Sequence, residues 1–519
     1  MANQTTAPVR RGRQNRVSQQ LDGDDSVQPA VWPGVEGGRY RPLSGDEEDN
    51  VHEASLHLLE TLGMSQAIPS MVEKVTARGG RLTEDRRLLF PRELILETIE
   101  TARREIILYG QRPGLEIDLS GSRVHMSSGG ASPEIVDLES GAYREPTTKD
   151  LYDAARLVDS LEHVHHFSRS LVARDAPDPL SMDINTAYAC LAGTSKPVSI
   201  SASDPVNVGA ISDICYTVAG SEAAFRARPF MTIVVCHVVP PMRFAEEACE
   251  TMEAAILAGF PVQIISAGQA GATSPATIAG SLVQAIAETL AGLAFARLVD
   301  ENVAAIFAPK PLVADLRTGA MSGGGGEQAI LMAAAAQMGR YYDLPTSSIA
   351  GITDAKIADA QHGYEKNLAV SLAAHAGCNL VTQACGMQAS LLGCSLESYV
   401  VDNDMLGNIL RSIRGVEATP ETIGTEVIAE VCRGEGHYLG HAQTLDRMKS
   451  DYVYPEVGDR RSPTEWEDDG ATDIRSRARD RTKEILGRHF PDHLDDATDR
   501  VLREHYDLLL SRAEIGRSG

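Results

Sequence analysis

The stretch Gly271-Ala-Thr-Ser-Pro-Ala-Thr-Ile-Ala-Gly280 lies between a short apolar run, Val262–Ser266, and a long apolar segment, Thr277–Phe295. A short apolar run, a polar turn and a long helical segment together predict one βα unit. The turn also contains hydroxyl groups that are costly to bury without hydrogen-bond partners. It therefore marks a place where a loop between a strand and a helix can carry chemistry.

The same alternation recurs along the chain from about residue 160. Seven apolar runs favour strands, and most are followed by an Ala- or Leu-rich helical segment. This pattern is typical of a parallel α/β sheet covered by helices. The runs are His163–Phe167, Val198–Ser201, Met231–Val239, Val262–Ser266, Val303–Ala308, Ser347–Ile352 and Asn379–Gln383. The pattern fits either a closed barrel of eight strands, with the eighth unassigned, or an open doubly wound sheet.

Composition divides the chain into four parts. Residues 1–45 are polar, with a basic cluster at positions 10–16, and are expected to form a disordered arm; a docking or nucleic-acid-binding arm is the alternative. Residues 46–160 contain two segments of helical periodicity, Asp46–Leu62 and Pro91–Ile107, and are interpreted as an α+β elaboration. The βα core is expected at 161–416. A mainly helical appendage, expected at 417–519, would begin with a helix at Pro420–Val431 and wrap the barrel or a neighbouring subunit.

The formal net charge of −24 argues against a nucleic-acid partner, because phosphates require a basic face. An acidic surface is compatible with a cationic small substrate, although solubility alone explains the charge equally well. The first 40 residues lack the apolar segment of a signal peptide, and the long apolar segment carries Gln284 and Glu288. We therefore expect a cytoplasmic protein with no membrane partner, in which this segment is a buried helix.

Eight cysteines occur without a Cys-x-x-Cys pair, and most lie in apolar segments, which favours buried free thiols in a reducing compartment. Cys236-His237 at the end of one strand and His375-Ala-Gly-Cys378 near the end of a helix leave zinc as a weaker hypothesis. An Asp-x-His-x-x-Gly cobalamin signature and a Gly-x-Gly-x-x-Gly dinucleotide motif are both absent. No metal or permanently bound cofactor is therefore assigned to this chain.

Two post-strand turns supply candidate substrate-binding residues, because the loops after the strands form the active face of a barrel. Thr273 and Ser274 can cap a helix that starts at Pro275, or they can bind a substrate carboxylate at the helix start. Asp315 and Arg317 can pair with each other or reach a substrate. The glycine run that follows, Gly323–Gly326, lacks the Lys-Ser or Lys-Thr of a phosphate loop, and a mobile lid or a plain flexible loop remain alternatives.

The densest segment is Thr353–Lys366, where more polar groups occur than helix capping needs. Gln361 and Glu365 are four residues apart and share one helical face. With Asp354 they are the candidate catalytic residues, and a capped, salt-bridged helix start is the structural alternative. A cationic amine also needs an aromatic face, for which the Tyr and Phe side chains are available because the two Trp lie outside the core. The remaining substrate-binding candidates are Lys356, Asp359, Tyr364, His237 and Phe307, with Tyr341 and Tyr342 as further aromatic candidates.

Several stretches resemble the trimethylamine methyltransferase family of corrinoid-linked enzymes. The resemblance runs from about His52 to about Leu494. The matching stretches are His52–Gly63, Gly141–Asp150, Ala270–Gly280, Asp315-Leu-Arg-Thr-Gly319, Asp354–Lys366 and Gly436–Leu445. It implies a TIM (β/α)8 barrel, and it implies that the enzyme passes a methyl group from a methylated amine to the Co(I) corrinoid (cobalamin) of a separate corrinoid protein.

One departure from that family bears on the substrate. Its archaeal trimethylamine enzymes carry pyrrolysine, whereas this sequence contains only ordinary residues. The resemblance therefore implies a quaternary amine of the glycine betaine, proline betaine or carnitine type, whose neutral amine is a good leaving group. A folate or free cobalamin as acceptor, a non-catalytic betaine-binding paralogue, and a zinc- or carboxylate-based lyase or hydrolase are the alternatives. A homo-oligomer is expected from the helical appendage.

Overall fold

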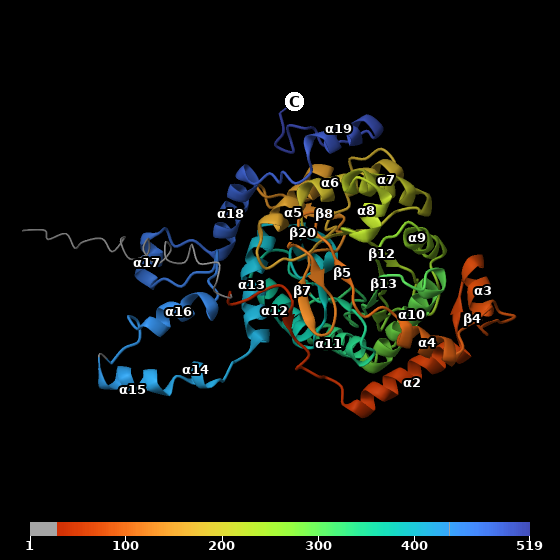
Figure 1. Ribbon diagram of the computed structural model, residues 1–519, viewed down its shortest axis with the longest axis horizontal. Coiled ribbons are helices and arrows are strands. Elements are labelled where there is room, and N and C mark those ends of the chain that lie inside the picture. Colours follow the sequence, from red (N-terminus) through yellow and green to blue (C-terminus); the bar gives the residue numbers. More distant parts are fainter. Residues whose placement is uncertain (1–28, 435, 519) are drawn as a thin grey trace, which may run out of the picture.

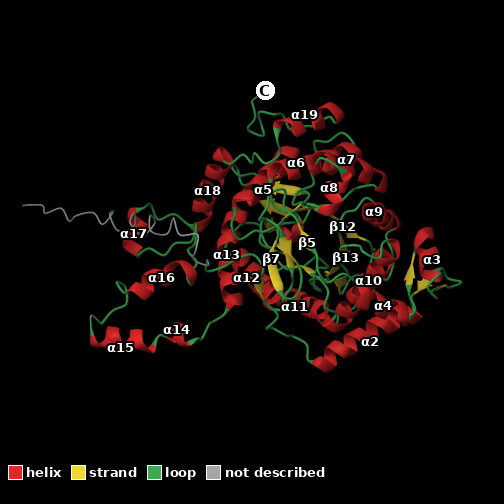
Figure 2. Ribbon diagram, viewed as in Figure 1, coloured by secondary structure: helices red, strands yellow, loops and turns green. Residues whose placement is uncertain are grey.

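A computed structural model describes residues 29–434 and 436–518, and its centre is a barrel of eight parallel strands surrounded by helices (Figure 2). Strand pairing runs around the barrel and returns to its start, because the last strand pairs with the first. Bridges Ser127–His166 and Phe307–Thr346 join the two remaining neighbours. The strands are β7 (Arg123–Met126), β10 (Phe167–Ser168), β11 (Val198–Ile200), β12 (Met231–Cys236), β13 (Val262–Ser266), β15 (Ala305–Pro309), β17 (Ser347–Ile349) and β18 (Leu380–Thr382).

All seven predicted strands are present, and the closed barrel is confirmed over the open sheet. The unassigned eighth strand is β7, which lies within the segment expected to be an N-terminal elaboration. The barrel therefore begins before residue 161. β7 escaped prediction because its apolar run is short and because His125, in its middle, faces the barrel interior instead of continuing that run.

The outer helices pack closely because small residues face the strands. Gly292 on α10 shows how close the layers are, since a Cβ there would lie 2.4 Å from the His237 ring. α10 is long and apolar enough to cross a membrane, but 78% of its most apolar window is buried inside the protein, as expected for a core helix. The helices are α5 (Thr148–Ser160), α6 (Pro179–Gly193), α7 (Val208–Ala219), α8 (Glu222–Ala227), α9 (Glu246–Leu257), α10 (Ile278–Val299), α11 (Gly326–Tyr341), α12 (Ala360–His375) and α13 (Leu396–Arg414).

The N-terminal elements cover one side and one end of the barrel (Figure 1). β1 (Val35–Glu36) pairs with β7, so this part of the expected disordered arm is ordered, whereas the basic cluster at positions 10–16 lies outside the described residues. Pro91 is the residue before its helix, not the first helical residue. The other elements are α2 (Gly45–Thr61), β2 (Met64–Ser65), α3 (Pro69–Thr76), β3 (Arg81–Leu82), β4 (Arg87–Leu89), α4 (Arg92–Thr101), β5 (Ile107–Leu108) and β6 (Ile117–Asp118).

The hairpin of β5 and β6 closes the N-terminal end of the barrel. Its buried side chains Leu108, Ile117 and Leu119 form a separate apolar cluster with Ile306 and Leu380, which begin two barrel strands. The opposite end of the barrel carries the loops, some of which form small sheets. These extra elements are β8 (Glu134–Val136), β9 (Tyr143–Arg144), β14 (Gln269–Ala270), β16 (Leu312–Val313), β19 (Met387–Gln388), β20 (Gly393–Ser395), η1 (Pro205–Asn207) and η2 (Ala389–Leu391).

The C-terminal appendage is helical, as expected, but only part of it wraps the barrel. α18 packs on α13 and α5, and α19 packs on α7. The helix expected at Pro420–Val431 is broken at Gly424, whose φ of +60° is the left-handed conformation that glycine adopts readily. Figure 1 shows α14 to α16 extending away from the barrel. The helices are α14 (Pro420–Ile423), α15 (Thr425–Arg433), α16 (Ala442–Ser450), α17 (Pro463–Asp468), α18 (Ile474–Arg488) and α19 (Asp496–His505).

Candidate active site

The contacts of three strand residues fix which side chains face the barrel interior. His237 packs against α10, Ser266 hydrogen-bonds Glu288 on α10, and Phe307 contacts Tyr342 at the end of α11. These three side chains therefore face outward, and their alternate neighbours face inward. The sequence analysis predicted that His237 and Phe307 bind substrate. Both side chains face the helix layer outside the barrel, so this prediction is wrong.

The barrel interior is unusually polar above the β5–β6 hairpin. Barrel cores of this kind are usually filled by layers of Val, Ile and Leu. Here the inward-facing positions are dominated by hydroxyl, amide, imidazole and ammonium groups. They are His125, Ser127, His166, Ser199, Thr232, Gln263, Lys310, Ser347 and Thr382. Such an interior is suited to a polar ligand.

His166 links three strands inside this polar interior. Its Nδ1 lies 2.7 Å from the Ser127 hydroxyl and its Nε2 lies 2.8 Å from the Ser199 hydroxyl. Burial lowers the pKa of His166 to about 3, so the ring is neutral near pH 7. It acts as a fixed hydrogen-bonding bridge between β7, β10 and β11.

Lys310 follows β15 and reaches toward β18 across the same interior. The residue is 2% exposed, and its Nζ donates a hydrogen bond of 2.9 Å to Thr382 Oγ1. Thr382 in turn donates to the Ser348 carbonyl. The Gln383 side-chain amide is oriented so that its oxygen accepts from the Gly130 N–H at 3.1 Å. In this orientation the amide nitrogen of Gln383 donates to Thr382. Among the described residues, no carboxylate forms an ion pair with Lys310.

The inward-facing ends of β12 and β13 are open to solvent. Cys236 is exposed although it ends a central strand, and Val234 and Ile265 are only half-buried. We call this surface, formed by Val234, Cys236 and Ile265, the barrel mouth. It lies at the C-terminal end of the strands, where barrel enzymes carry their active sites. Six of the eight cysteines are buried as expected, and the prediction was wrong for Cys236 and Cys432.

Asp354 connects three of the loops above the mouth. Its carboxylate accepts hydrogen bonds from the Gly323 N–H at 2.8 Å, the Gly324 N–H at 3.3 Å and the Ser390 hydroxyl at 2.6 Å. Ser390 lies in a run of three residues with φ between +49° and +71°, a conformation that costs about 1 kcal/mol or more per residue outside glycine. Asp354 thus stabilises a strained loop beside the mouth.

Glu365 and Gln361 form the second part of this cluster. Glu365 accepts hydrogen bonds from Thr353 Oγ1 at 2.6 Å, from the Asp354 N–H at 2.8 Å and from the Gln361 amide at 2.8 Å. A Cβ at Gly324 would lie 2.1 Å from the Glu365 carboxyl carbon, so only glycine permits this approach. The structure therefore brings the three candidate catalytic residues together, with most of their hydrogen-bonding capacity used between loops.

The other candidates in this segment do not bond the carboxylates of the cluster. Asp359 caps α12 through the N–H groups of Gln361 and His362, which is the structural alternative stated above. The exposed Lys356 donates to the Asp354 carbonyl at 2.6 Å, and Tyr364 is 64% exposed on α12. Two further residues of the segment, His362 and Lys366, are buried against Asp402 on α13 at 2.8 Å and 2.6 Å. That network joins two helices.

The loops after β13 and β15 lie side by side through pairing of β14 and β16. Thr273 accepts from the Gln269 N–H at 2.8 Å within its own loop, and Ser274 bonds Ser281 on α10 at 2.7 Å, so both hydroxyls are engaged locally. The expected cap is wrong, since α10 begins after Thr277. Arg317 is 87% exposed and pairs with Asp315 at 2.8 Å, which lowers the pKa of Asp315 to about 2.

The aromatic and zinc hypotheses find little support in this geometry. Tyr342 packs against Phe307 in the helix layer, and Tyr341 bonds Asp49 on α2. Cys236 and His237 face opposite sides of β12, while Cys378 precedes β18 at the far end of the barrel. Across residues 29–434 and 436–518, no group of three or more His, Cys, Asp and Glu side chains is placed to hold a metal ion.

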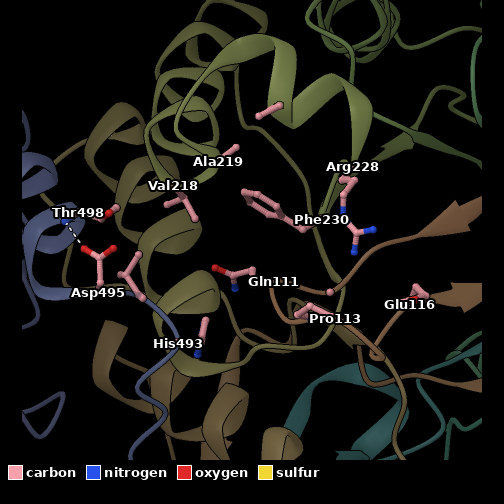
Figure 3. Close-up of a pocket in the computed structure, with 13 residues that line it drawn as sticks. Gln111, Pro113, Glu116, Val218, Ala219, Arg228, Phe230, His493, Asp495 and Thr498 are labelled. Carbon is pink, nitrogen blue, oxygen red and sulfur yellow. Dashed lines mark hydrogen bonds between the residues drawn. The ribbon is translucent and has the colours of Figure 1, made fainter.

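A cleft of about 380 Å³ lies at the opposite end of the molecule (Figure 3). Gln111 and His493 point toward it from the barrel base and the C-terminal appendage, and both donate hydrogen bonds to the Leu191 carbonyl. Asp495 caps α19 through the Thr498 N–H. Because this end of a barrel normally serves stability, and because these groups serve the junction, we do not assign chemistry to the cleft.

The C-terminal end of the barrel carries several exposed large apolar side chains, which we call the apolar rim. Six loops or helix starts at the C-terminal end of the strands each expose one large apolar side chain. They are Leu180, Val206, Val239, Leu316, Ile357 and Leu392. Exposed apolar side chains are ordinary when scattered, but a set on the loops of one end of a barrel indicates a surface for contact with another molecule.

Sequence reasoning missed Lys310, Thr382 and the exposed Cys236. The signal for Lys310 was available, because a charged residue between Pro309 and Pro311 ends an otherwise apolar strand. The accessibility of Cys236 was not predictable, because it depends on how far the neighbouring side chains fill the mouth.

Comparison with known proteins agrees with this architecture. The model of the trimethylamine methyltransferase family matches residues 9–509. The chain belongs to the trimethylamine methyltransferase family. It is 27% identical to a glycine betaine methyltransferase of Desulfitobacterium hafniense (strain Y51), covering 90% of this chain and 96% of the relative. It is also 27% identical to a trimethylamine methyltransferase of Desulfitobacterium hafniense (strain DSM 10664 / DCB-2), covering 90% and 94%.

The fold is shared with a solved structure of the monomethylamine methyltransferase of Methanosarcina barkeri. The two chains superpose with a TM-score of 0.51 over 91% of this chain and 92% of the other, at 10% sequence identity. At that identity the likeness concerns the fold alone. It agrees with the TIM barrel expected from the sequence.

Proposed function

We propose that this protein removes a methyl group from a small quaternary amine of the betaine type and passes it to the Co(I) corrinoid of a partner protein. The observation that carries the proposal is the polar barrel interior, which opens at a mouth on the same end of the barrel as the apolar rim. A polar interior suits a small charged substrate, and an apolar rim suits a protein that covers the opening. Membership of a methyltransferase family supplies the reaction class.

The residues of this chain bind and orient the substrate. A quaternary nitrogen needs no activating nucleophile, so the enzyme's task is to align one methyl group and to exclude water. Val234, Cys236 and Ile265 would contact the methyl groups. Asp354 and Glu365 would supply negative potential on the rim side, and Gln361 would keep Glu365 in place. Their local hydrogen bonds support a positioning role more than direct contact with the substrate.

The corrinoid would supply a strongly nucleophilic Co(I) centre that accepts the methyl group. The chain itself offers a surface that fits such a partner, because the apolar rim lies at the same end of the barrel as the mouth and leaves the strand ends accessible. Leu316 and Leu392 stand on loops at opposite ends of the Asp354 hydrogen-bond cluster. Docking at the rim would close the mouth and bring the acceptor to the methyl group.

The same proposal includes a cytoplasmic location and a homo-oligomer. The second is supported by α14 to α16, which extend away from the barrel and expose Ile423, Ile428, Leu439 and Leu445. An apolar surface on an extended segment is suited to a second copy of the chain.

The test is methyl transfer from a panel of methylated amines to Co(I) cobalamin, followed by visible absorbance. Transfer from glycine betaine, proline betaine or carnitine would support the proposal and identify the substrate. The assay is repeated with the corrinoid protein encoded nearest this gene. Tight betaine binding without transfer to either acceptor would contradict the enzymatic role and favour a binding protein.

A further inference from the structure

Lys310 is one of two largely buried basic residues at the C-terminal ends of the strands that form no ion pair with a described carboxylate; the other is Arg169, whose Nε is buried without a hydrogen-bond partner. Lys366 is fully buried and pairs with Asp402 at 2.6 Å. Lys196 donates to the carbonyls of Val158, Leu161 and Val164 at 2.6–2.7 Å. Lys310, by contrast, uses one of its three N–H donors, on Thr382. A buried ammonium with two unused donors is expensive unless another group meets it.

The surroundings of Lys310 indicate where that group comes from. Lys310 faces the barrel interior at the C-terminal end of β15, on the same side of the wall as the exposed Cys236. β12, which ends at Cys236, and β15, which Lys310 follows, are both neighbours of β13 in the barrel wall. The open route to the ammonium is therefore the barrel mouth, through which a small molecule can enter.

The interior also lacks the usual means of holding a lone cation. The inward-facing residues of the eight described strands include no Phe, Tyr or Trp, so no aromatic cage lines the barrel. No Asp or Glu occupies those positions either. An uncompensated cation entering this space would meet the Lys310 ammonium and be repelled. A zwitterion would bring its own counter-charge.

We propose that Lys310 binds the carboxylate of the substrate, so that the enzyme accepts zwitterionic betaines and rejects methylated amines that lack a carboxylate. The inference rests on the proposed function and names the residue that sets its specificity. Lys310 takes the place of Arg317, Thr273 and Ser274 as the proposed carboxylate ligand. Those three side chains already pair or hydrogen-bond with residues close in sequence. Thr382 positions the ammonium, and Val234, Cys236 and Ile265 contact the methylated end.

Direct binding tests this without any corrinoid. Isothermal titration is performed on the full-length protein with glycine betaine, proline betaine and carnitine, and with tetramethylammonium and choline, which have no carboxylate. We expect at least one of the three carboxylate compounds to bind. Tetramethylammonium and choline, which lack a carboxylate, should not bind. Lys310→Met should weaken that binding about a hundred-fold, and Lys310→Arg should recover part of the loss because it keeps the charge. Lys483→Met, on the distant α18, is the matched control.

Three results would overturn the inference: equal betaine affinity in Lys310→Met, equal loss in Lys310→Arg, or wild-type binding of choline or tetramethylammonium as tight as that of the betaines. The methyl-transfer assay separates this failure from failure of the proposed function. Transfer from choline or tetramethylammonium would keep the function and end the specificity claim. Lys310-dependent betaine binding without transfer to any corrinoid would keep the specificity claim and end the function.

Discussion

A lysine lies at each end of the barrel, and the two ammonium groups differ in how many of their hydrogen-bond donors are used. At the N-terminal end, Lys196 lies beside the C-terminus of α5 and donates to three backbone carbonyls. At the C-terminal end, Lys310 donates to one hydroxyl and faces an open mouth. The first arrangement satisfies every donor and uses the negative end of a helix, so it stabilises the fold. The second leaves binding capacity unused, which is the arrangement expected where a ligand will bind.

The largest expected effect is the contrast between Lys196→Met and Lys310→Met in folding stability. Lys196→Met should reduce the free energy of unfolding by about 3 kcal/mol, because three carbonyls lose a charged donor. Lys310→Met should leave stability unchanged or raise it, because an isolated buried charge is removed. Urea unfolding of both variants measures this. If Lys310→Met destabilised the protein as much as Lys196→Met does, Lys310 would have a structural role and the contrast between the two lysines would be wrong.

The next effect concerns the loops above the mouth. Asp354→Ala and Glu365→Ala should each lower methyl-transfer activity about a hundred-fold, because the strained loop at Ser390 and the glycine loop lose their common anchor. Stability should fall by only about 1–2 kcal/mol. Asp473→Ala, which removes a helix cap of α18, is the control: it should cost a similar stability and no activity. Wild-type turnover in both Asp354→Ala and Glu365→Ala would contradict a role of these two carboxylates in methyl transfer.

How much of this was predictable from sequence depends on whether a feature is local. The seven apolar strands and α10 follow from short-range patterns, and the cluster around Asp354 follows from an unusual density of polar residues in one turn. β7 was missed because a polar interior places His125 and Ser127 where apolar residues mark most strands. The outward orientation of His237 and Phe307 was missed because alternation along a strand gives two faces without saying which one is inside. To predict Lys310 as a binding residue, one would need to know that its side chain faces the barrel interior and that no carboxylate pairs with it.

A smaller effect is the pH dependence of stability at Lys310. Burial lowers its pKa from 10.5 to about 7, so between these values the unfolded chain binds a proton that the folded chain does not. The cost of burying the ammonium is therefore fully present below about pH 7 and is lost as the pH rises. Relative to the Lys310→Met variant, the free energy of unfolding of the wild type should rise by roughly 2 kcal/mol between pH 6 and pH 8.5.

Urea unfolding at the two pH values measures that gain. Burial also shifts the pKa values of Cys236, Cys378 and His166, but their contributions cancel in this comparison because both proteins contain these residues. Lys483→Met should differ from wild type by the same amount at both pH values. A difference between wild type and Lys310→Met that does not change with pH would mean that the Lys310 ammonium is already compensated and has no unmet charge for a ligand.

The smallest expected effect tests whether the C-terminal end also meets a partner. Replacing Leu316 and Leu392 together by Ala removes two exposed apolar side chains from the rim. Their truncation should raise the KM for the corrinoid protein about thirty-fold, because each buried apolar side chain contributes about 1 kcal/mol at an interface. Val416→Ala removes a more exposed apolar side chain after α13 and should leave that KM unchanged. If the two variants behave alike, the apolar rim is ordinary surface, and the functional end of the barrel is defined by its polar interior alone.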